Sequence, residues 1–237
     1  GDSAFSGCSA LPSVRIPQGV TTIEKGAFER CNGLVSVNIS GSVTSIGKLA
    51  FSECFGITEF QVSQENPSYQ GVDGALFSKD GTVLVAYPAG KKGESYTIPD
   101  GVTTIEERAF AGCTQLVSVK IPKGVTTIGD RAFYNCYRIS SLSLPNSLTT
   151  IGYGGFEGCS TLTWVTIPHS VTTVEDVAFL DCPKLALVTI ENSDITIGTY
   201  AFGYYWNTQA SRAKALEGVA IQGNVGATAQ TYAKENG

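Results

Sequence analysis

The stretch GVTTIGDRAFYNC, residues 124–136, recurs along the chain with few changes. Its copies include GVTTIEKGAFERC at 19–31, GVTTIEERAFAGC at 101–113 and SVTTVEDVAFLDC at 170–182. In every copy a cysteine follows the phenylalanine of an Ala-Phe pair by three residues. Self-similarity at a fixed period is the sequence signature of a repeat array, so the phrase predicts one rung of a stacked scaffold.

The period is 23 residues. The phenylalanine recurs at Phe5, Phe28, Phe51, Phe110, Phe133, Phe156, Phe179 and Phe202. Only one step differs, because Phe51 and Phe110 are 59 residues apart, which is two periods plus 13. The cysteines keep step three residues later, at Cys8, Cys31, Cys54, Cys113, Cys136, Cys159 and Cys182. All seven cysteines of the chain are thereby accounted for.

Within one period, the pattern predicts three short pieces of structure. In LVSVKIP, residues 116–122, Val119 and Ile121 alternate with polar residues, which is typical of a strand with one buried face. Pro122 ends this strand because it has no N–H to donate. VTTI at 125–128 predicts a second extended piece, and GDRAFYNC at 129–136 predicts a single helical turn.

A unit of this size cannot bury its own apolar edge, but stacked copies can cover one another at a spacing of about 4.8 Å. The sequence therefore predicts an α/β fold: a right-handed solenoid of 23-residue rungs, with a parallel β-sheet on one face and short helical turns on the other. The alanine of each Ala-Phe pair, replaced once by Gly155, is expected to be small because neighbouring turns approach closely.

Two segments depart from the period. Between Phe51 and Phe110, the runs ALF and TVLVAY flank Lys79-Asp80-Gly81, which predicts a β-hairpin in place of the usual helical turn. The far end, GYYWNTQASRAKA and GVAIQGNVGATAQTYAKENG, predicts a longer loop and a short closing helix. We therefore divide the single solenoid, residues 1–237, into N-terminal rungs 1–62, a β-hairpin insertion 63–98, C-terminal rungs 99–212 and a terminal cap 213–237.

Composition excludes several classes of protein. The net charge of −5 is mild and the basic residues are scattered, which argues against a nucleic-acid binder. No apolar run approaches the roughly 18 residues of a membrane span. The first residues, GDSAFSGC, match GDRAFYNC at the framework positions, so we expect the chain to be a piece of a longer array.

The repeat resembles a known family. Leu-x-x-Val-x-Ile-Pro followed by Val-Thr-Thr-Ile-Gly-x-x-Ala-Phe-x-x-Cys is similar to the BspA-like leucine-rich repeats of bacterial surface proteins. The segments DGALFSKDGTVLVAYP and TAQTYAKENG also resemble segments that accompany those repeats. The resemblance implies a curved solenoid displayed outside the cell, with roles in adhesion to host matrix or cell-surface proteins. It supplies no catalytic residues.

No set of reactive side chains is predicted to converge. Equivalent Cβ atoms on adjacent rungs would lie about 4.8 Å apart, beyond the roughly 3.8 Å of a disulfide, so we expect buried free thiols. The only histidine, His169, falls in a turn, and neither a metal site nor a catalytic pair is expected. The sequence therefore predicts no enzyme and no cofactor.

Recognition is expected on the exposed face of the main strands, where neighbouring rungs join their side chains into one surface. The candidate contact residues are Lys120, Ser141, Ser143, Trp164, Thr166, Leu187 and Thr189. Trp164 beside Leu187 is the apolar exception on a polar face. Two interpretations stay open: this pair marks a contact site, or the C-terminal loop with Tyr204, Tyr205 and Trp206 folds over it. A cluster of Tyr134, Tyr137 and Tyr153 on the turn side is a second candidate.

The repeat, its resemblance to the surface-protein family and the lack of a converging reactive set together favour a monomeric, non-enzymatic adhesion or protein-binding module outside a bacterial cell, with no nucleic-acid partner and no membrane insertion in this segment. A structural spacer that presents another domain is the first alternative. Glycan binding through Trp164 or the tyrosines is the second.

Overall fold

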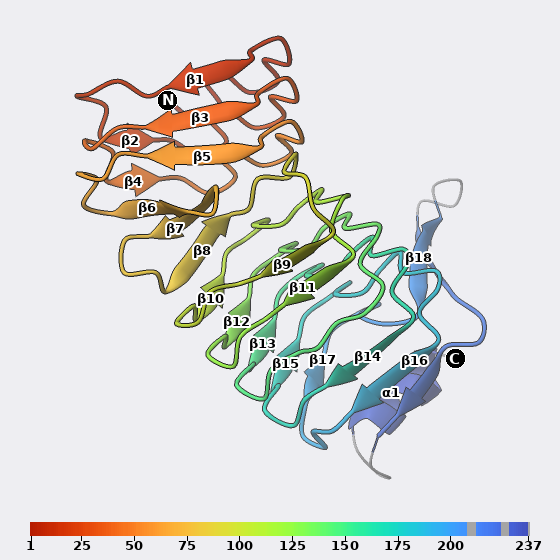
Figure 1. The fold of residues 1–237 in the computed structure, drawn as a ribbon. Coiled ribbons are helices and arrows are strands. Elements are labelled where there is room, and N and C mark those ends of the chain that lie inside the picture. Colours follow the sequence, from red (N-terminus) through yellow and green to blue (C-terminus); the bar gives the residue numbers. More distant parts are fainter. Residues whose placement is uncertain (208–211, 224–227, 237) are drawn as a thin grey trace.

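The computed structural model describes residues 1–207, 212–223 and 228–236. Residues 208–211 of the predicted C-terminal loop, and residues 224–227 and 237 of the predicted cap, lie outside the described residues. The chain forms an elongated array of similar rungs (Figure 1). Most rungs contribute one strand to a main sheet, a shorter strand to a second sheet and a tight turn. The predicted solenoid with 23-residue rungs and parallel sheets is therefore confirmed.

The strands pair in parallel with a shift of one period from rung to rung. In the N-terminal part the main strands are β1 (Ser13–Arg15), β3 (Ser36–Ile39) and β5 (Glu59–Val62), and the second-sheet strands are β2 (Thr22–Ile23) and β4 (Ser45–Ile46). In the C-terminal part the main strands are β9 (Ser95–Thr97), β11 (Ser118–Lys120), β14 (Trp164–Ile167), β16 (Leu187–Ile190) and β20 (Ala220–Gln222). The second-sheet strands there are β10 (Thr104–Ile105), β12 (Thr127–Ile128), β13 (Thr150–Ile151), β15 (Thr173–Val174) and β17 (Thr196–Ile197).

The turns after the second-sheet strands are not helical, so the predicted helical turns and α/β class are wrong, and the rungs form a β-solenoid. In the turn at 129–136, Arg131 and Asn135 have φ values of 50° and 57°, in the left-handed region that a right-handed helix excludes. Backbone hydrogen bonds within the turn therefore alternate with backbone hydrogen bonds to the next rung. Ala132 N donates to Gly129 O (3.1 Å), whereas Phe133 N donates to Gly155 O (2.8 Å). Each turn thus holds its neighbour through its backbone.

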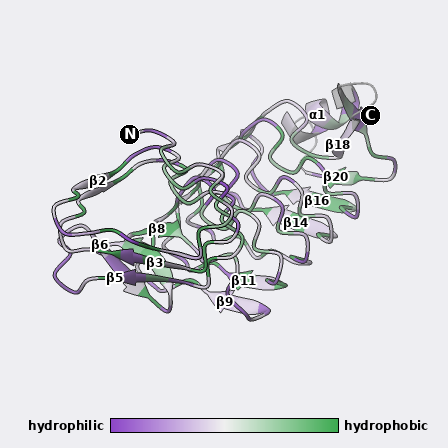
Figure 2. Cartoon of the chain, turned by 90° about the horizontal axis from the view of Figure 1, so that it is seen from above, coloured by the Kyte–Doolittle hydropathy of each residue, from purple (hydrophilic) through white to green (hydrophobic). Residues whose placement is uncertain are grey.

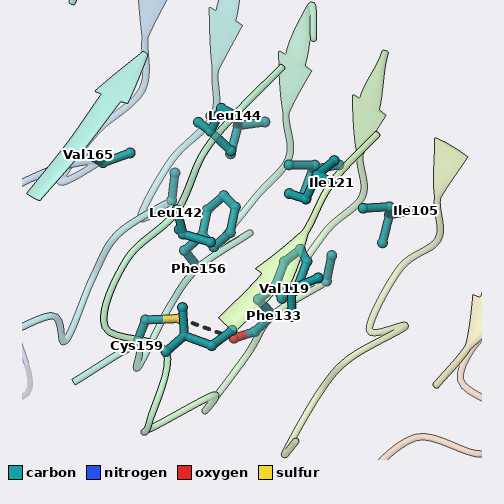
Figure 3. Close-up of a cluster of buried hydrophobic side chains, with 14 of the residues drawn as sticks. Ile105, Val119, Ile121, Phe133, Leu142, Leu144, Phe156, Cys159 and Val165 are labelled. Carbon is teal, nitrogen blue, oxygen red and sulfur yellow. Dashed lines mark hydrogen bonds between the residues drawn. The ribbon is translucent and has the colours of Figure 1, made fainter. Parts of the chain in front are cut away.

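The phenylalanines form a stacked file inside the array. From Phe110 to Phe202 successive ring centroids are 4.8 to 5.1 Å apart, with planes inclined by 5° to 22°. Phe133 and Phe156 are fully buried among the inward residues of both sheets (Figure 3). Val119, Leu142 and Val165 face them from the main-sheet side, as the alternating pattern predicts.

The inserted segment interrupts this order. It forms three antiparallel strands, β6 (Tyr69–Val72), β7 (Ala75–Ser78) and β8 (Val83–Ala86), with Gly81 in the left-handed turn between β7 and β8. The sequence predicted that the hairpin replaces the turn of its rung, but it does not. Instead β8, which is strongly hydrophobic (Figure 2), pairs with β10 and supplies the second-sheet strand. Tyr87 then takes the phenylalanine position and stacks on Phe110 at 5.1 Å.

The insertion also divides the core. Leu76 of β7 packs with the N-terminal rungs, whereas Ala75 and Phe77 pack with the C-terminal rungs. β7 thus separates the two hydrophobic clusters and contributes apolar side chains to both. The strands change direction at this point (Figure 1), and β4 and β8 belong to separate sheets.

The C-terminal end covers the last rung. β18 (Tyr204–Asn207) and β19 (Arg212–Ala215) form an antiparallel pair, and α1 (Thr228–Asn236) follows β20. The Tyr232 ring of α1 meets Phe202 edge-on at 6.1 Å, and its hydroxyl bonds the Phe202 backbone N (3.0 Å) and O (3.2 Å). Among the described residues, no helix has the length and apolar character needed to cross a bilayer.

Candidate functional site

The predicted contact residues lie on the exposed face of the main sheet, and the structure brings some of them together. Trp164 is in register with Leu187, and Thr166 is in register with Thr189. The side chain of Trp164 is 47% exposed, whereas Val165 between Trp164 and Thr166 is 1% exposed. The strand thus presents its indole to solvent while its neighbour fills the core.

The described residues of the C-terminal loop do not cover this pair. β18 is tied to the turn column, because Asp181 N donates to Tyr204 O (2.9 Å) and Trp206 N donates to Asp181 Oδ1 (2.6 Å). The next neighbour of Leu187 on the main sheet is Ala220 of β20, a small side chain. In the described part of the chain, Trp164 therefore stands at the edge of an open surface.

The other candidate residues are more widely spread. Lys120 lies at the end of β11 in register with Thr97. Ser141 and Ser143 are exposed on either side of the buried Leu142, but residues 140–145 are not assigned to a strand. The main sheet is therefore interrupted between β11 and β14. Only Trp164, Thr166, Leu187 and Thr189 form one continuous patch, which we call the Trp164 patch.

The cysteines are protected in the core, with one exception. Six are buried and free, and Cys8 in the first rung is exposed. Burial raises the pKa of the Cys182 thiol to about 12 and also raises the pKa of Cys159. These thiols stay protonated, so they are poor nucleophiles and poor metal ligands.

The buried thiols also donate hydrogen bonds, which the sequence did not reveal. Cys136 Sγ donates to Phe110 O (3.1 Å), and Cys159 Sγ donates to Phe133 O (3.5 Å; Figure 3). Each thiol thus gives a backbone carbonyl of the preceding rung a second donor, because Phe110 O already accepts from Cys113 N (3.1 Å) and Phe133 O from Cys136 N (3.3 Å). The cysteine is a hydrogen-bonding part of the scaffold as well as an apolar filler.

Elsewhere in the described residues, no group of side chains with metal-ligand chemistry converges. His169 lies exposed in its turn, where its backbone N donates to Glu191 Oε2 (3.2 Å). Within the ranges that the structure describes, no three His, Cys, Asp or Glu side chains could together hold a metal ion. The threonine columns have a structural use, since Thr126 Oγ1 donates to Thr103 O (3.2 Å) and Thr149 Oγ1 to Thr126 O (3.0 Å).

The tyrosine cluster on the turn side is held by arginine. The Arg131 guanidinium lies over Tyr134 and Tyr153, 5.5 and 5.1 Å from the ring centroids, and Nε binds Glu157 Oε2 at 2.9 Å. The Arg108 guanidinium also lies over Tyr134, 5.6 Å from the ring centroid. Sequence reasoning named the tyrosines but missed the arginines. The available signal was that Arg108 and Arg131 occupy the same position of adjacent rungs.

The Arg–Tyr contacts continue into ion pairs that cross the insertion. Arg108 Nη1 binds Glu53 Oε1 at 2.8 Å, and Arg30 Nε binds Glu53 Oε2 at 3.0 Å. Burial acts to raise the pKa of Glu53, but hydrogen bonds from Arg30 and Arg108 outweigh it, and the pKa falls below its usual value. The charged face of the turns therefore links the two parts of the array.

With this geometry established, comparison with known proteins identifies the repeat. The model of the BspA type leucine-rich repeat region matches residues 1–79 and 88–208 in 6 copies. The chain belongs to this family. The two matched ranges flank the junction of β8 with its turn, where the structure departs from the regular rung. Comparison with curated proteins gives no match.

Solved structures share the fold. A leucine-rich cell surface protein from Faecalibacterium prausnitzii has a TM-score of 0.69 and 28% identity, covering 88% of this chain and 63% of its own. The pneumococcal vaccine antigen PcpA has a TM-score of 0.69 at 23% identity, covering 91% of this chain and 58% of its own. A leucine-rich repeat protein from Bacteroides ovatus has a TM-score of 0.51 at 26% identity, with 85% and 55% coverage. The chain thus spans less than two thirds of the length of each.

Proposed function

We propose that this chain is a protein-binding module of the adhesion type, displayed on or outside a bacterial cell, and that the Trp164 patch contacts the ligand. The family consists of repeat scaffolds, and the F. prausnitzii relative is described as a cell surface protein. The module acts as a monomer and without catalysis. Its ligands are host matrix or cell-surface proteins.

The observation that carries the proposal is the exposed indole of Trp164 beside Leu187 on an otherwise small and polar face. Tryptophan is enriched among residues whose removal strongly weakens binding, because it combines a large apolar area with few rotatable bonds. The parallel sheet fixes the backbone under both side chains. An indole on a rigid surface loses little conformational entropy when a partner covers it.

The chain offers a matched control. It has two tryptophans, and Trp206 is 49% exposed on β18, on the turn side. A panel of extracellular matrix proteins is tested for binding to the parent chain and to Trp164→Ala, Leu187→Ala and Trp206→Ala. We expect the first two variants to weaken binding by about 2 kcal/mol or more and Trp206→Ala to leave it unchanged. Unchanged binding in both Trp164→Ala and Leu187→Ala removes the proposed surface.

A structural spacer is the alternative that a specific feature favours. Apart from the Trp164 patch, the exposed face of the main sheet carries small polar residues such as Ser13, Ser95 and Ser118. A spacer binds none of the panel, and its parent gene encodes a further functional domain. Glycan binding by Trp164 or the tyrosines is distinguished by an oligosaccharide array.

A further inference from the structure

The junction between the N-terminal rungs and the insertion contains a cavity of about 290 Å³. It lies between the turn at residues 47–54 and the turn that follows β8. The two turns differ in length. Leu84 is in register with Ile105, yet Tyr87 follows Leu84 by three residues whereas Phe110 follows Ile105 by five. The turn after β8 is therefore two residues shorter and does not fill the space that a full rung would occupy.

One wall of this cavity is the apolar edge of the third rung. Phe51 and Ile46 are half-buried, whereas Phe110 and Ile105 at the same positions of the fifth rung are fully buried. Phe51 lacks the stacked ring that continues the phenylalanine file elsewhere, and its forward contact is an edge-on one with Phe60 at 5.3 Å. Val83, Val85, Ala86, Tyr87 and Ala89 supply the opposite wall.

The same edge presents backbone donors. In the rung before it, Gly26 N, Phe28 N and Arg30 N donate to the carbonyls of Lys48, Ala50 and Ser52 at 2.9 to 3.0 Å. In the fifth rung, the N–H groups of Arg108, Phe110 and Gly112 donate in the same way to backbone carbonyls of the sixth rung. The equivalent donors of the third rung are Leu49 N, Phe51 N and Glu53 N. Among the residues that the structure describes, none of these three N–H groups has a hydrogen-bond acceptor.

This edge differs from the edge of a β-strand. A strand edge alternates N–H and C=O groups, and so accepts another strand. Here Leu49 and Glu53 have φ values of 63° and 58°, and the carbonyls of Lys48, Ala50 and Ser52 are already engaged by the preceding rung. At this edge the unpaired backbone N–H groups of Leu49 and Phe51 belong to residues that line the cavity. Backbone N–H groups that point the same way form a concave anion site, and such sites capture carboxylates.

Two cations stand at the rim of the cavity. Arg108 Nη1 contacts Ser52 Oγ at 3.3 Å as well as Glu53, and Lys48 Nζ lies 3.4 Å from Glu107 Oε2. The acidic residues Glu53 and Glu107 are thus paired, while Glu106 also lines the rim. A carboxylate that enters the cavity meets donors at its base and paired charges at its mouth.

The geometry points to a binding site in this cavity for an apolar monocarboxylate, whose two oxygens accept the N–H groups of Leu49 and Phe51 while its apolar body packs on Phe51, Ile46 and Val85. The volume is at the lower end of ligand pockets and suits a short acyl chain or a single apolar side chain. Two sources share this chemistry: a free short-chain fatty acid and the C-terminal carboxylate of a peptide ending in an apolar residue.

The test uses the full chain labelled with ¹⁵N. Hexanoate is titrated against hexanamide, and acetyl-Ala-Leu with a free carboxylate against its C-terminal amide. We expect each carboxylate that binds to shift the amide signals of Leu49 and Phe51, and its neutral amide to bind roughly tenfold more weakly. The signals of Gly26, Phe28 and Arg30 serve as an internal control and stay in place.

The two arms distinguish the sources, since a site for peptide termini prefers acetyl-Ala-Leu and a site for fatty acids prefers hexanoate. Ala89→Phe places a ring in the cavity and should abolish the shifts in both arms, whereas Ala10→Phe, on an exposed alanine of the first rung, should not. If neither carboxylate moves the signals of Leu49 and Phe51, or if the neutral amides move them equally, the proposal is overturned. The spectra of the parent chain decide this even if Ala89→Phe fails to fold. No residue of the Trp164 patch lines the cavity, so Trp164→Ala should leave these shifts unchanged.

Discussion

Replacing Phe133 with alanine tests the phenylalanine file at its centre. The ring is fully buried and lies between Phe110 at 4.8 Å and Phe156 at 5.0 Å. Removing a buried phenylalanine costs about 3–5 kcal/mol, which combines lost transfer free energy with the cavity that remains. Each stacked pair adds about 0.5–1.5 kcal/mol beyond area burial. Since Phe133 loses two stacked neighbours, we expect a value near the upper end, about 4–5 kcal/mol.

Phe5 provides the matched comparison. It occupies the same position of the first rung, but it is 52% exposed and stacks on one ring only, Phe28, at 5.2 Å. Phe5→Ala should therefore cost about 1 kcal/mol. Both variants are compared with the parent chain by urea unfolding followed by far-ultraviolet circular dichroism. Equal destabilisation by the two substitutions would refute the idea that stacking within the file stabilises the array.

Three further substitutions test other contacts. Glu53→Gln should lower the free energy of unfolding at pH 7 by about 1–3 kcal/mol, because it leaves the half-buried Arg108 without its carboxylate. The pKa of Glu53 is lowered in the folded state, so the stability that its charged form contributes is lost as the pH falls through and below about 4.3. The difference in unfolding free energy between the parent chain and Glu53→Gln should therefore vanish at low pH, and a difference that stays constant with pH would contradict this. Tyr96→Phe should stabilise the protein by about 1 kcal/mol in urea unfolding. The Tyr96 hydroxyl is the one buried side-chain polar atom of the described residues that has no hydrogen-bond partner, and phenylalanine removes it. Destabilisation by Tyr96→Phe would show that the hydroxyl does have a hydrogen-bond partner. Cys136→Ala should cost about 0.5–1.5 kcal/mol because Phe110 O loses its thiol donor but keeps the N–H of Cys113, and the absence of any measurable cost would make the thiol bond irrelevant.

The repeat could be predicted from the sequence because it depends on local periodicity. The 23-residue spacing, the alternation around Val119 and the small residue before each phenylalanine all reflect burial that recurs in each rung. Such positions are constrained by their own rung and its two neighbours. A pattern that repeats in register therefore carries the same structural information several times.

The turn conformation was predicted wrongly for a physical reason. A three-residue spacing between Phe133 and Cys136 fits a helical turn, but it equally fits a turn bounded by two left-handed residues. Glycines gave the missing signal, since Gly154 and Gly158 stand two residues before and after Phe156, and both have positive φ. Glycine adopts this conformation without steric cost, so its recurrence at both positions indicates left-handed ends.

The candidate site could be predicted only in part. Exposure of Trp164 and its pairing with Leu187 follow from strand alternation and register, and both are present in the structure. The Arg131 contacts and the cavity beside Phe51 do not follow from the pattern. They depend on how far a side chain reaches across rungs, and on a turn that is two residues short after the insertion.

Counting the reactive thiols of the native protein tests the scaffold most directly. Ellman's reagent is added to the chain at pH 8, first folded and then in urea. The structure predicts one fast thiol in the folded protein, Cys8, and all seven after unfolding, because the other six are buried free thiols in the core. Rapid reaction of several thiols in the folded chain, or fewer than seven in urea, would show open or bridged cysteines and contradict the account.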